Sequence, residues 1–371
     1  MTLKPLLTSL SGLLAMAGPA LAQSYTYTPF DVSCPVGATI CPAGLAPGAT
    51  AQQTSARGVN ARGDIVGFYV DTAGRQHGFL RQDGQFATLD FPVAGLRAAI
   101  ANGINDQGEV VGQYLLPVNP NVSDDSPLFC PTDIPPPPAG GSPTPDPACI
   151  KAFHWARGTF TTVMFSGHPG AIAQRFTADG DIYGCLHDHD LGMSMFGSAW
   201  TRSFGAKNSV SVQDTFSLTD SGGELSDPMG VPMSMNNGAT PGGAHTIVGF
   251  FVDMANQQHG YVVEDGTFRK YDPTSDTNLT AIWDMNPSQQ FVGAYRKAGE
   301  LAAKRHGFVQ SSNGAAVVTL DVNFVDASGN PVSAFSTNAF GINPDAVIVG
   351  QYALVSGGPT HGFVAFPAGS N

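Results

Sequence analysis

The chain has 371 residues, of which 12% are charged, and it contains 45 glycines and 28 prolines. Low charge with abundant Gly, Thr, Val and Phe is typical of short strands and tight turns and argues against a helical protein. The formal net charge of −12 repels phosphate backbones, so nucleic acid is excluded as a favoured partner.

The first residues have the pattern of a secretory signal peptide. Lys4 gives a positive start, Pro5–Met16 is mostly apolar, and Ala20-Leu21-Ala22 is a small-x-small cleavage site. That segment is too short to span a membrane, and no later stretch predicts a transmembrane segment. We expect residues 1–22 to be removed, leaving one domain over 23–371 in a secreted or periplasmic bacterial monomer.

Five cysteines in a secreted chain favour disulfide pairing. Cys34 and Cys41 lie in one loop rich in proline and glycine, and Cys130 and Cys149 bracket a run of prolines. Local pairing, Cys34–Cys41 and Cys130–Cys149, is the economical arrangement. Cys185 is then predicted to be a buried free thiol in a core strand.

The chain repeats one phrase along most of its length. A turn that begins with Asn leads into a strand with a Val-Gly-x-Tyr core, as in Asn60–Tyr69, Asn105–Tyr114 and Asn343–Tyr352. The next strand usually begins with His-Gly-Phe or His-Gly-Tyr, at His77, His259, His306 and His361. A fourth strand carries Gly-x-Phe and ends in Asp. Each unit therefore predicts four short strands separated by turns, with apolar residues alternating along them.

The glycines of the second strands count the units. They are Gly67, Gly112, Gly184, Gly249, Gly293 and Gly350. The shortest spacings, about 44 residues, match one four-stranded propeller blade, and longer spacings indicate insertions.

The two ends of the repeat region complement each other. The last unit stops after its third strand, at His361–Phe366, and Tyr25–Asp31 has the pattern of the missing fourth strand. Pairing of the two would hide exposed strand edges. We predict an all-β six-bladed β-propeller of four-stranded blades, closed by the N-terminal strand, with an open β array as the alternative.

The phrases quoted above resemble the HAF repeat of probable extracellular bacterial proteins. The resemblance covers most of the chain outside the loops, and it implies secretion and a propeller-like fold without a settled activity. The chain departs from the pattern in the second unit, where Lys151-Ala-Phe153 replaces His-Gly-Phe. In the third unit, Phe196-Gly197 stands near the expected His-Gly. In these two units, residues of a functional site could have replaced the residues of the repeat.

All unusual segments fall in two classes of loop. Loops that join second to third strands, and fourth strands to the next first strand, emerge on one face of such a fold. They include the Cys34–Cys41 loop and the proline-rich insertion 116–150. Long rigid loops on a scaffold commonly carry function, so we predict the site on this face.

The sharpest cluster on those loops is His187-Asp188-His189-Asp190. Two imidazoles and two carboxylates could perform acid–base catalysis. Together with His168 of the preceding loop, His187 and His189 could instead hold a divalent metal, the one cofactor that the sequence suggests. The alternative is a turn in which Asp caps backbone amides and His packs on a neighbour.

A second set of outliers lies on the first strands. Gly58, Gly103 and Gly341 occupy one position of the repeat, and the matching positions hold Arg175 and Asp284 in the third and fifth units. First strands border the central channel of a propeller. Arg175 and Asp284 could therefore bind a charged or sugar-like ligand, or form a buried structural pair. The recurrent histidines, one in each of four units, are predicted to hydrogen-bond their own loops.

The leading hypothesis is a secreted binding protein that presents one loop-rich face to an extracellular polymer, glycan or cell-envelope partner. The alternative is an extracellular hydrolase or lyase acting on a carbohydrate, ester or lactone, with its site near His168, His187, His189 and Asp190. A scaffold without a small ligand is a third hypothesis. Propellers host such roles alike, so the fold does not choose between them.

Overall fold

The computed structural model describes residues 24–123, 126–134, 144–163, 170–177, 180, 182–187, 195–202, 210–216, 231–237, 245–253, 255, 257–264, 267–311 and 316–369. These residues form an all-β structure with one short 3-10 helix, Pro147–Cys149. Within these ranges, no helix has the length and hydropathy needed to cross a bilayer. The predicted signal peptide, 1–22, lies outside the described residues.

Antiparallel pairing sorts most strands into groups of four. The first strands are β2 (Gln53–Val59), β6 (Ala98–Ile104), β12 (Gly170–Phe176), β16 (Val231–Asn237), β20 (Thr277–Met285) and β26 (Ser336–Ile342). The second strands are β3 (Ile65–Val70), β7 (Val110–Leu115), β13 (Ile182–His187), β17 (His245–Val252), β21 (Gln290–Lys297) and β27 (Ile348–Ala353). Each second-strand glycine of the repeat phrase lies in one of these strands.

The outer strands follow in the same order. The third strands are β4 (Gln76–Gln82), β10 (Ile150–Ala156), β14 (Met195–Arg202), β18 (Gln258–Glu264), β22 (His306–Ser311) and β28 (Thr360–Pro367). The fourth strands are β5 (Gln85–Thr88), β11 (Thr159–Val163), β15 (Val210–Phe216), β19 (Thr267–Tyr271), β23 (Val318–Leu320) and β1 (Tyr25–Phe30). Two small hairpins lie in loops, β8 (Asp133–Ile134) with β9 (Thr144–Pro145) and β24 (Asn323–Val325) with β25 (Pro331–Ser333).

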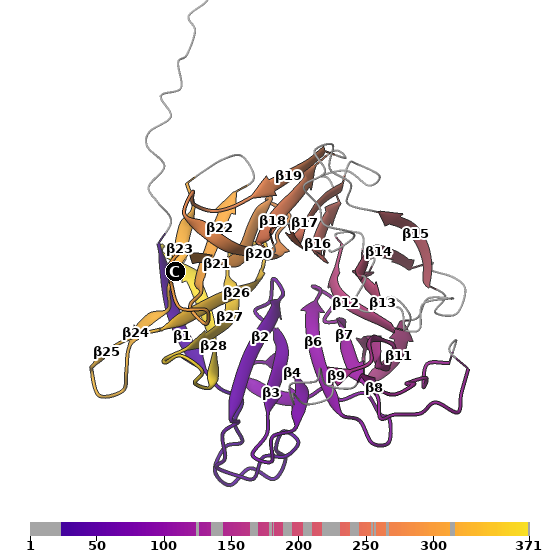
Figure 1. Ribbon diagram of the computed structural model, residues 1–371. Coiled ribbons are helices and arrows are strands. Elements are labelled where there is room, and N and C mark those ends of the chain that lie inside the picture. The colour runs from indigo at the N-terminus through magenta and orange to yellow at the C-terminus, as the bar shows by residue number, and fades with distance from the viewer. Residues whose placement is uncertain are drawn as a thin grey trace, which may run out of the picture.

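The groups stand around a common axis with their first strands innermost, a propeller-like arrangement (Figure 1). The last group takes its fourth strand from the other end of the chain. β1 pairs antiparallel with β28, from Tyr25 opposite Pro367 to Phe30 opposite Gly362. The predicted pairing of the N-terminal strand with the last unit is therefore confirmed, and the two ends of the described chain lie in one sheet.

The hydrophobic core lies between neighbouring groups. Val66 and Leu80 of one group pack with Tyr114 and Phe153 of the next, and all four are buried. Burying one such side chain stabilises the fold by about 1.5–3 kcal/mol. Because each group has a neighbour on both sides, both faces of its sheet need apolar residues, as the alternation in the sequence predicts.

Each first strand carries a β-bulge at the same position. The register shifts there by one residue, for example between Ala56 and Gly58. The extra residues at the bulges are Arg57, Asn102, Gln174, Met233, Trp283 and Phe340. A bulged residue has no ladder partner and bends its strand.

The second-strand glycine pairs with the residue before the bulge, as Gly350 does with Ala339. A Cβ at Gly350 would overlap the carbonyl oxygen of Asn338 on the first strand and lie 2.7 Å from the Phe363 ring on the third. Gly67, Gly112 and Gly293 have matching neighbours. The Gly of the Val-Gly phrase and the Phe of the His-Gly-Phe phrase therefore pack against each other.

Both predicted disulfides are present, Cys34–Cys41 between β1 and β2 and Cys130–Cys149 in the insertion between β7 and β10. Cys185 lies in β13, as predicted, and its side chain is outside the described part of the chain.

Gly350→Ala is expected to lower the free energy of unfolding by about 1–3 kcal/mol, because the added methyl group meets backbone that cannot move away. Urea denaturation measures the difference. Gln351→Ala, at the neighbouring half-buried position, is the control and is expected to change stability much less. Equal effects of the two substitutions would contradict this account of the glycine.

Candidate functional site

The strand directions give the molecule two unlike ends. Turns that join first to second and third to fourth strands lie at the turn end, which includes residues 60–64, 105–109, 286–289 and 343–347. The other loops lie at the loop-rich end, which includes residues 31–52, 116–149, 298–305, 321–335 and 354–359.

A polar cavity of about 210 Å³ opens on the axis at the turn end. Asparagines of four turns line it and link neighbouring groups through their side chains. Asn286 Nδ2 donates to Asn343 O at 3.0 Å, Asn343 Nδ2 donates to Asn60 O at 3.0 Å, and Asn60 Nδ2 donates to Asn105 O at 3.1 Å. The repeated Asn therefore forms its own turn, as predicted, and also ties that turn to the next group.

Arg175 crosses the axis deeper in this cavity and binds the bulges. Its Nη2 donates to the carbonyl oxygens of Arg57 at 3.0 Å and Phe340 at 2.6 Å. Its Nη1 donates to the carbonyl oxygens of Gln174 at 2.8 Å and Asn102. All four acceptors are bulge residues, whose carbonyls a regular ladder would have satisfied. The guanidinium plane, in which these donors lie, therefore spans the channel.

Asp284 completes the contacts of Arg175. Its Oδ1 lies 3.1 Å from Arg175 Nε, in an ion pair that lacks hydrogen-bond alignment, and the side chains are 9% and 10% exposed. Met285 N donates to Oδ1 at 2.9 Å and Ile342 N donates to Oδ2 at 3.1 Å. The structure thus brings the two first-strand outliers together as a buried pair. Both also line the cavity, so their contact with a ligand stays a prediction.

Arg175→Lys is expected to lower the free energy of unfolding by about 3–5 kcal/mol, since a lysine cannot serve the four carbonyls and leaves Asp284 poorly paired. Arg62→Lys is the matched control, because Arg62 is 47% exposed in its pair with Asp64. Exposed pairs contribute less than about 1 kcal/mol. Chemical denaturation compares the two, and a similar small loss for both would refute the structural role of Arg175.

The recurrent histidines are each held by carboxylates of their own group, as predicted. The Nδ1 atoms lie near the Asp after the fourth strand: His77 and Asp90 at 2.7 Å, His259 and Asp272 at 2.8 Å, His306 and Asp321 at 2.9 Å, His361 and Asp31 at 2.8 Å. The Nε2 atoms lie near a carboxylate of the preceding loop: His77 and Asp71 at 3.2 Å, His259 and Asp253 at 3.2 Å, His306 and Glu300 at 2.9 Å. We call these contacts the histidine clamps. In the last group the Asp after the fourth strand is Asp31, because β1 supplies that strand.

Contacts in the clamps shift the pKa of His77, His361 and Asp71. The hydrogen bond with Asp90 raises the pKa of His77, and the one with Asp31 raises that of His361. Burial alone would raise the pKa of Asp71, yet hydrogen bonds from the Arg75 backbone and His77 lower it to about 2. The imidazolium and the carboxylates therefore stabilise each other's charged forms.

Because of the clamps, we expect their stabilisation of the folded state to decrease both above and below mildly acidic pH. A histidine with a raised pKa stabilises the fold fully below about pH 6.5, and this stabilisation is lost as pH rises through the folded-state pKa. The depressed Asp71 contributes above about pH 4 and loses its contribution as pH falls toward its pKa of about 2. The contribution of the clamps to the free energy of unfolding should therefore be higher at about pH 5.5 than at about pH 8.5.

This loss between about pH 5.5 and pH 8.5 should shrink in the double variant His77→Gln/His361→Gln, whose amides do not titrate. Denaturant unfolding at both pH values measures it. Parallel pH profiles of variant and wild type would show that the clamps do not cause the dependence.

The second unit replaces its clamp with Lys151. The register places Lys151 opposite Tyr114, where His77 lies opposite Tyr69 in the first group. Lys151 is buried, its Nζ lies 5.8 Å from the Phe129 ring, and burial lowers its pKa to about 8 against the opposing charge of Asp146. In the third unit, Phe196 takes the matching position opposite Leu186.

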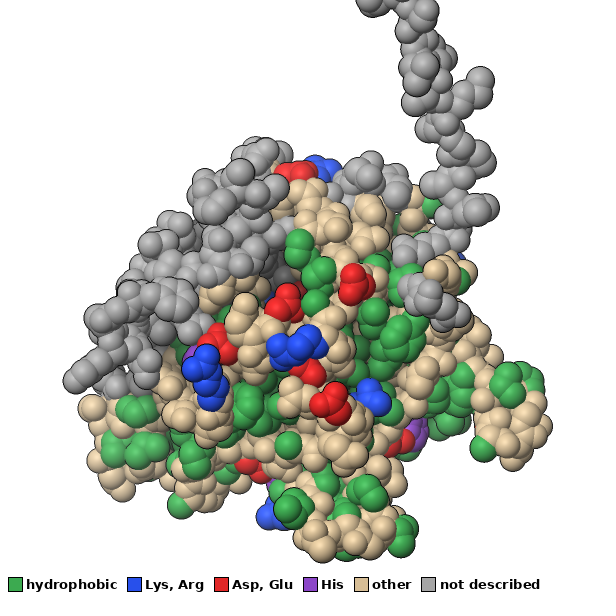
Figure 2. Space-filling model, turned by 180° about the vertical axis from the view of Figure 1, so that it is seen from behind, with side chains coloured by type: hydrophobic (Ala, Val, Ile, Leu, Met, Phe, Trp, Pro, Cys, Tyr) green, Lys and Arg blue, Asp and Glu red, His purple; other side chains and the backbone are tan. Residues whose placement is uncertain are grey.

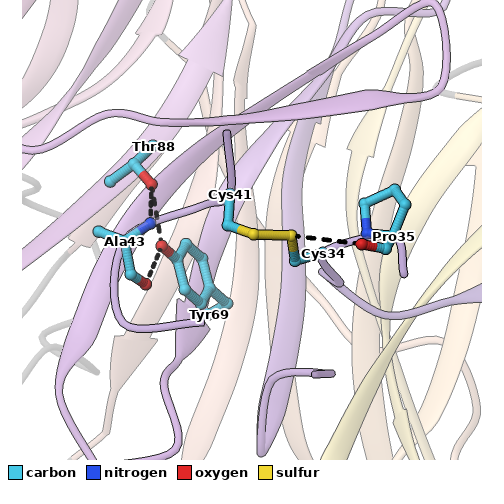
Figure 3. The surroundings of a disulfide bond; sticks show 6 residues. All are labelled: Cys34, Pro35, Cys41, Ala43, Tyr69 and Thr88. Atoms are coloured by element: carbon cyan, nitrogen blue, oxygen red, sulfur yellow. Dashed lines mark hydrogen bonds between the residues drawn. A yellow bond between two sulfur atoms is a disulfide. The ribbon is translucent and has the colours of Figure 1, made fainter. Parts of the chain in front are cut away.

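The segment that follows the Cys34–Cys41 loop is fixed to the first group by hydrogen bonds of Ala43 (Figure 3). Tyr69 Oη donates to Ala43 O at 2.8 Å, and Ala43 N donates to Thr88 Oγ1 at 2.7 Å. The disulfide therefore closes the loop covalently, and the hydrogen bonds of Ala43 hold the chain just after it against β3 and β5.

Apolar side chains project from the loop-rich end. Val36 and Ile40, inside the disulfide loop, are 91% and 88% exposed. Of the exposed large hydrophobic residues in the described part, only Phe366 lies toward the turn end, and the others are Val36, Ile40, Val118, Leu128, Leu301, Val325, Leu354 and Val355. Figure 2 shows hydrophobic side chains on the segments that project from the body of the molecule.

The predicted acid–base or metal cluster stays a prediction. His187 ends β13, but its side chain and the residues His168, Asp188, His189 and Asp190 lie outside the described part of the chain. Among the side chains that the structure does describe, no group of three or more His, Cys, Asp or Glu could hold a metal ion. The hydrolase or lyase alternative, which rests on that cluster, is untested in the same way.

The bulge residues are what the sequence reading missed. Each precedes the repeated Gly position of a first strand, as Arg57 precedes Gly58 and Phe340 precedes Gly341. The position before the bulge is Ala in four units and the position after it is Gly in three, whereas the bulge position holds a different residue in each unit. That variability within a regular phrase was the available signal.

No protein-family model matches the chain, and no curated protein sequence matches it. Similar solved structures include the lectin SapL1 in complex with alpha methyl fucoside, with 9% identity, a TM-score of 0.45 and coverage of 86% of this chain and 95% of the lectin. A Trypanosoma rangeli sialidase has 10% identity, a TM-score of 0.45 and coverage of 87% and 56%. A gluconolactonase from Xanthomonas campestris has 11% identity, a TM-score of 0.39 and coverage of 86% and 89%. At these values none of them assigns a ligand or an activity to this chain.

Proposed function

We propose that this chain is a secreted binding protein whose loop-rich end docks on an extracellular polymer, glycan or cell-envelope partner. The observation that carries the proposal is the exposure of Val36 and Ile40 in a disulfide-closed loop. Apolar side chains gathered on one end of a molecule are typical of a surface that meets a partner.

The rigidity of the loop supports a binding role. A loop that is ordered before binding loses less conformational freedom when it meets its partner. The disulfide, together with the hydrogen bonds of Tyr69 and Thr88, supplies that order. The Cys130–Cys149 disulfide fastens the second long loop, which carries the exposed Val118 and Leu128.

The platform that holds these loops is proposed to be a closed six-bladed propeller of the HAF-repeat type. Contacts between consecutive first strands support closure, because each of them contacts the next and β26 contacts β2. The pairing of β1 with β28 supports it as well. Closure would join every strand group to two neighbours and hold the loops in fixed relative positions.

The test is co-sedimentation of the purified protein with peptidoglycan, insoluble polysaccharides and outer-membrane vesicles. The double variant Val36→Asp/Ile40→Asp should bind the retained material at least about 10-fold more weakly, since it places charge where apolar contact is required. Phe366→Asp, at the other end, is the matched control and should bind like the wild type. Equal binding by the loop variant would exclude the loop as the docking surface, and no binding by the wild type would exclude these partner classes.

A further inference from the structure

A continuous stack of aromatic and arginine side chains follows the inside of the channel. Phe250 contacts Trp283 at 5.4 Å between ring centroids, and Trp283 contacts Phe340 at 5.2 Å. The guanidinium carbon of Arg57 lies 3.9 Å from the centroid of Phe340 and 5.2 Å from that of Phe68. These five side chains, the axial stack, come from four strand groups, and three of them are bulge residues.

The axial stack lies on the loop-rich side of Arg175. Phe68 pairs with Ser55 and Phe250 pairs with Val231, near the starts of β2 and β16. First strands start at the loop-rich end, whereas the Arg175 side chain lines the cavity that opens at the turn end. Arg175 therefore separates the axial stack from that cavity, and the stack belongs to the other half of the channel.

Two donors in the axial stack are buried without a partner. Arg57 Nε and Trp283 Nε1 make no hydrogen bond with any residue that the structure describes. No carboxylate of the described residues lies within ion-pair distance of Arg57, and Asp284 is held by Arg175. Burial, together with the nearby charge of Arg175, lowers the pKa of Arg57 to about 9, and at neutral pH the group is still a cation. Two buried N–H groups that lack hydrogen-bond partners are costly, and a bound anion with acceptor oxygens would satisfy both.

The geometry around Arg57 defines the shape of such a ligand. Phe340 and Phe68 cover the guanidinium, so its N–H edges are what a ligand can reach. Those edges match the two oxygens of a carboxylate. The rings of Trp283 and Phe250 are half-buried and offer apolar surface beside it. Asn102 and Gln174 occupy the bulge positions of the two groups that follow Arg57, and Asn102 Nδ2 donates to Ala173 O at 3.0 Å.

We propose that the axial stack is a binding site for a small carboxylate attached to a saturated ring, the chemistry of a uronic acid. Arg57 binds the carboxylate through its N–H edge, Trp283 Nε1 donates to an oxygen of the ligand, and the C–H face of the ring packs on the aromatic side chains. This site is separate from the loop surface around Val36 and Ile40, so each proposal can fail without the other.

The test is isothermal titration of the mature protein with sodium glucuronate and, as the neutral analogue, with glucose. The wild type should show saturable binding of glucuronate and none of glucose. Arg57→Gln should weaken glucuronate binding by roughly 30-fold or more, because it removes a charged partner from a desolvated site. Trp283→Phe keeps the ring and removes the N–H, and it should weaken binding by roughly 3- to 10-fold.

Arg62→Gln is the matched control, since it removes the same charge at the turn end and should leave the affinity unchanged. Failure of glucuronate to saturate the wild type, equal affinity for glucose, or equal effects of Arg57→Gln and Arg62→Gln would overturn the proposal. If Arg57→Gln does not fold, Arg57→Lys decides, because it keeps the charge and loses the planar fork. We expect about 10-fold weaker binding for Arg57→Lys, and an unchanged affinity would overturn the site. The Val36→Asp/Ile40→Asp variant should bind glucuronate like the wild type.

Discussion

The β-bulge in each first strand is the constraint on which the rest of the structure depends. Beside it, a first-strand carbonyl lies against the second strand, so only glycine fits there, and the Phe of the third strand packs on that glycine. The bulge also releases the carbonyl of the bulged residue from its ladder, and buried carbonyls need a donor. Arg175 supplies donors to four of these carbonyls at once. The repeated phrase and the position of Arg175 at the axis are thus both linked to one backbone feature.

The two ends of the molecule are stabilised in different ways, and this difference bears on function. At the turn end, asparagine side chains link neighbouring turns, so the same residue serves the local turn and the packing of groups. At the loop-rich end, histidine clamps fasten the loops after the second strands to the ends of the fourth strands. Disulfides add covalent links to the two loops that carry cysteines. The loops that project furthest are therefore anchored at their bases, which lets their tips expose apolar side chains without loss of the fold.

Charge along the axis is unevenly balanced. Arg175 and Asp284 neutralise each other in a pair whose remaining polar atoms are bound to backbone. Arg57, on the loop-rich side, has aromatic rings as neighbours and repels Arg175. A fold that needed only structural polar contacts at this level could use amides, as the groups with Asn102 and Gln174 do. Arg57 Nε is buried and has no hydrogen-bond partner among the described residues, which is costly, and this distinguishes the channel from a packed core.

The sequence by itself determined the strand order, the unit boundaries, the two disulfides and the pairing of the N-terminal strand with the last unit. These features follow from period, turn residues and cysteine spacing, which act over short stretches of chain. It also predicted Arg175 and Asp284 beside the central channel, because both lie on first strands, at a position that is Gly in other units. Only the tertiary structure decided that the bulge residues converge, and that Arg175 binds carbonyls of residues as distant as Arg57 and Phe340. The physical reason is that the curvature of the groups around one axis brings together positions that share no local pattern, and a bulge becomes visible only when two strands are paired.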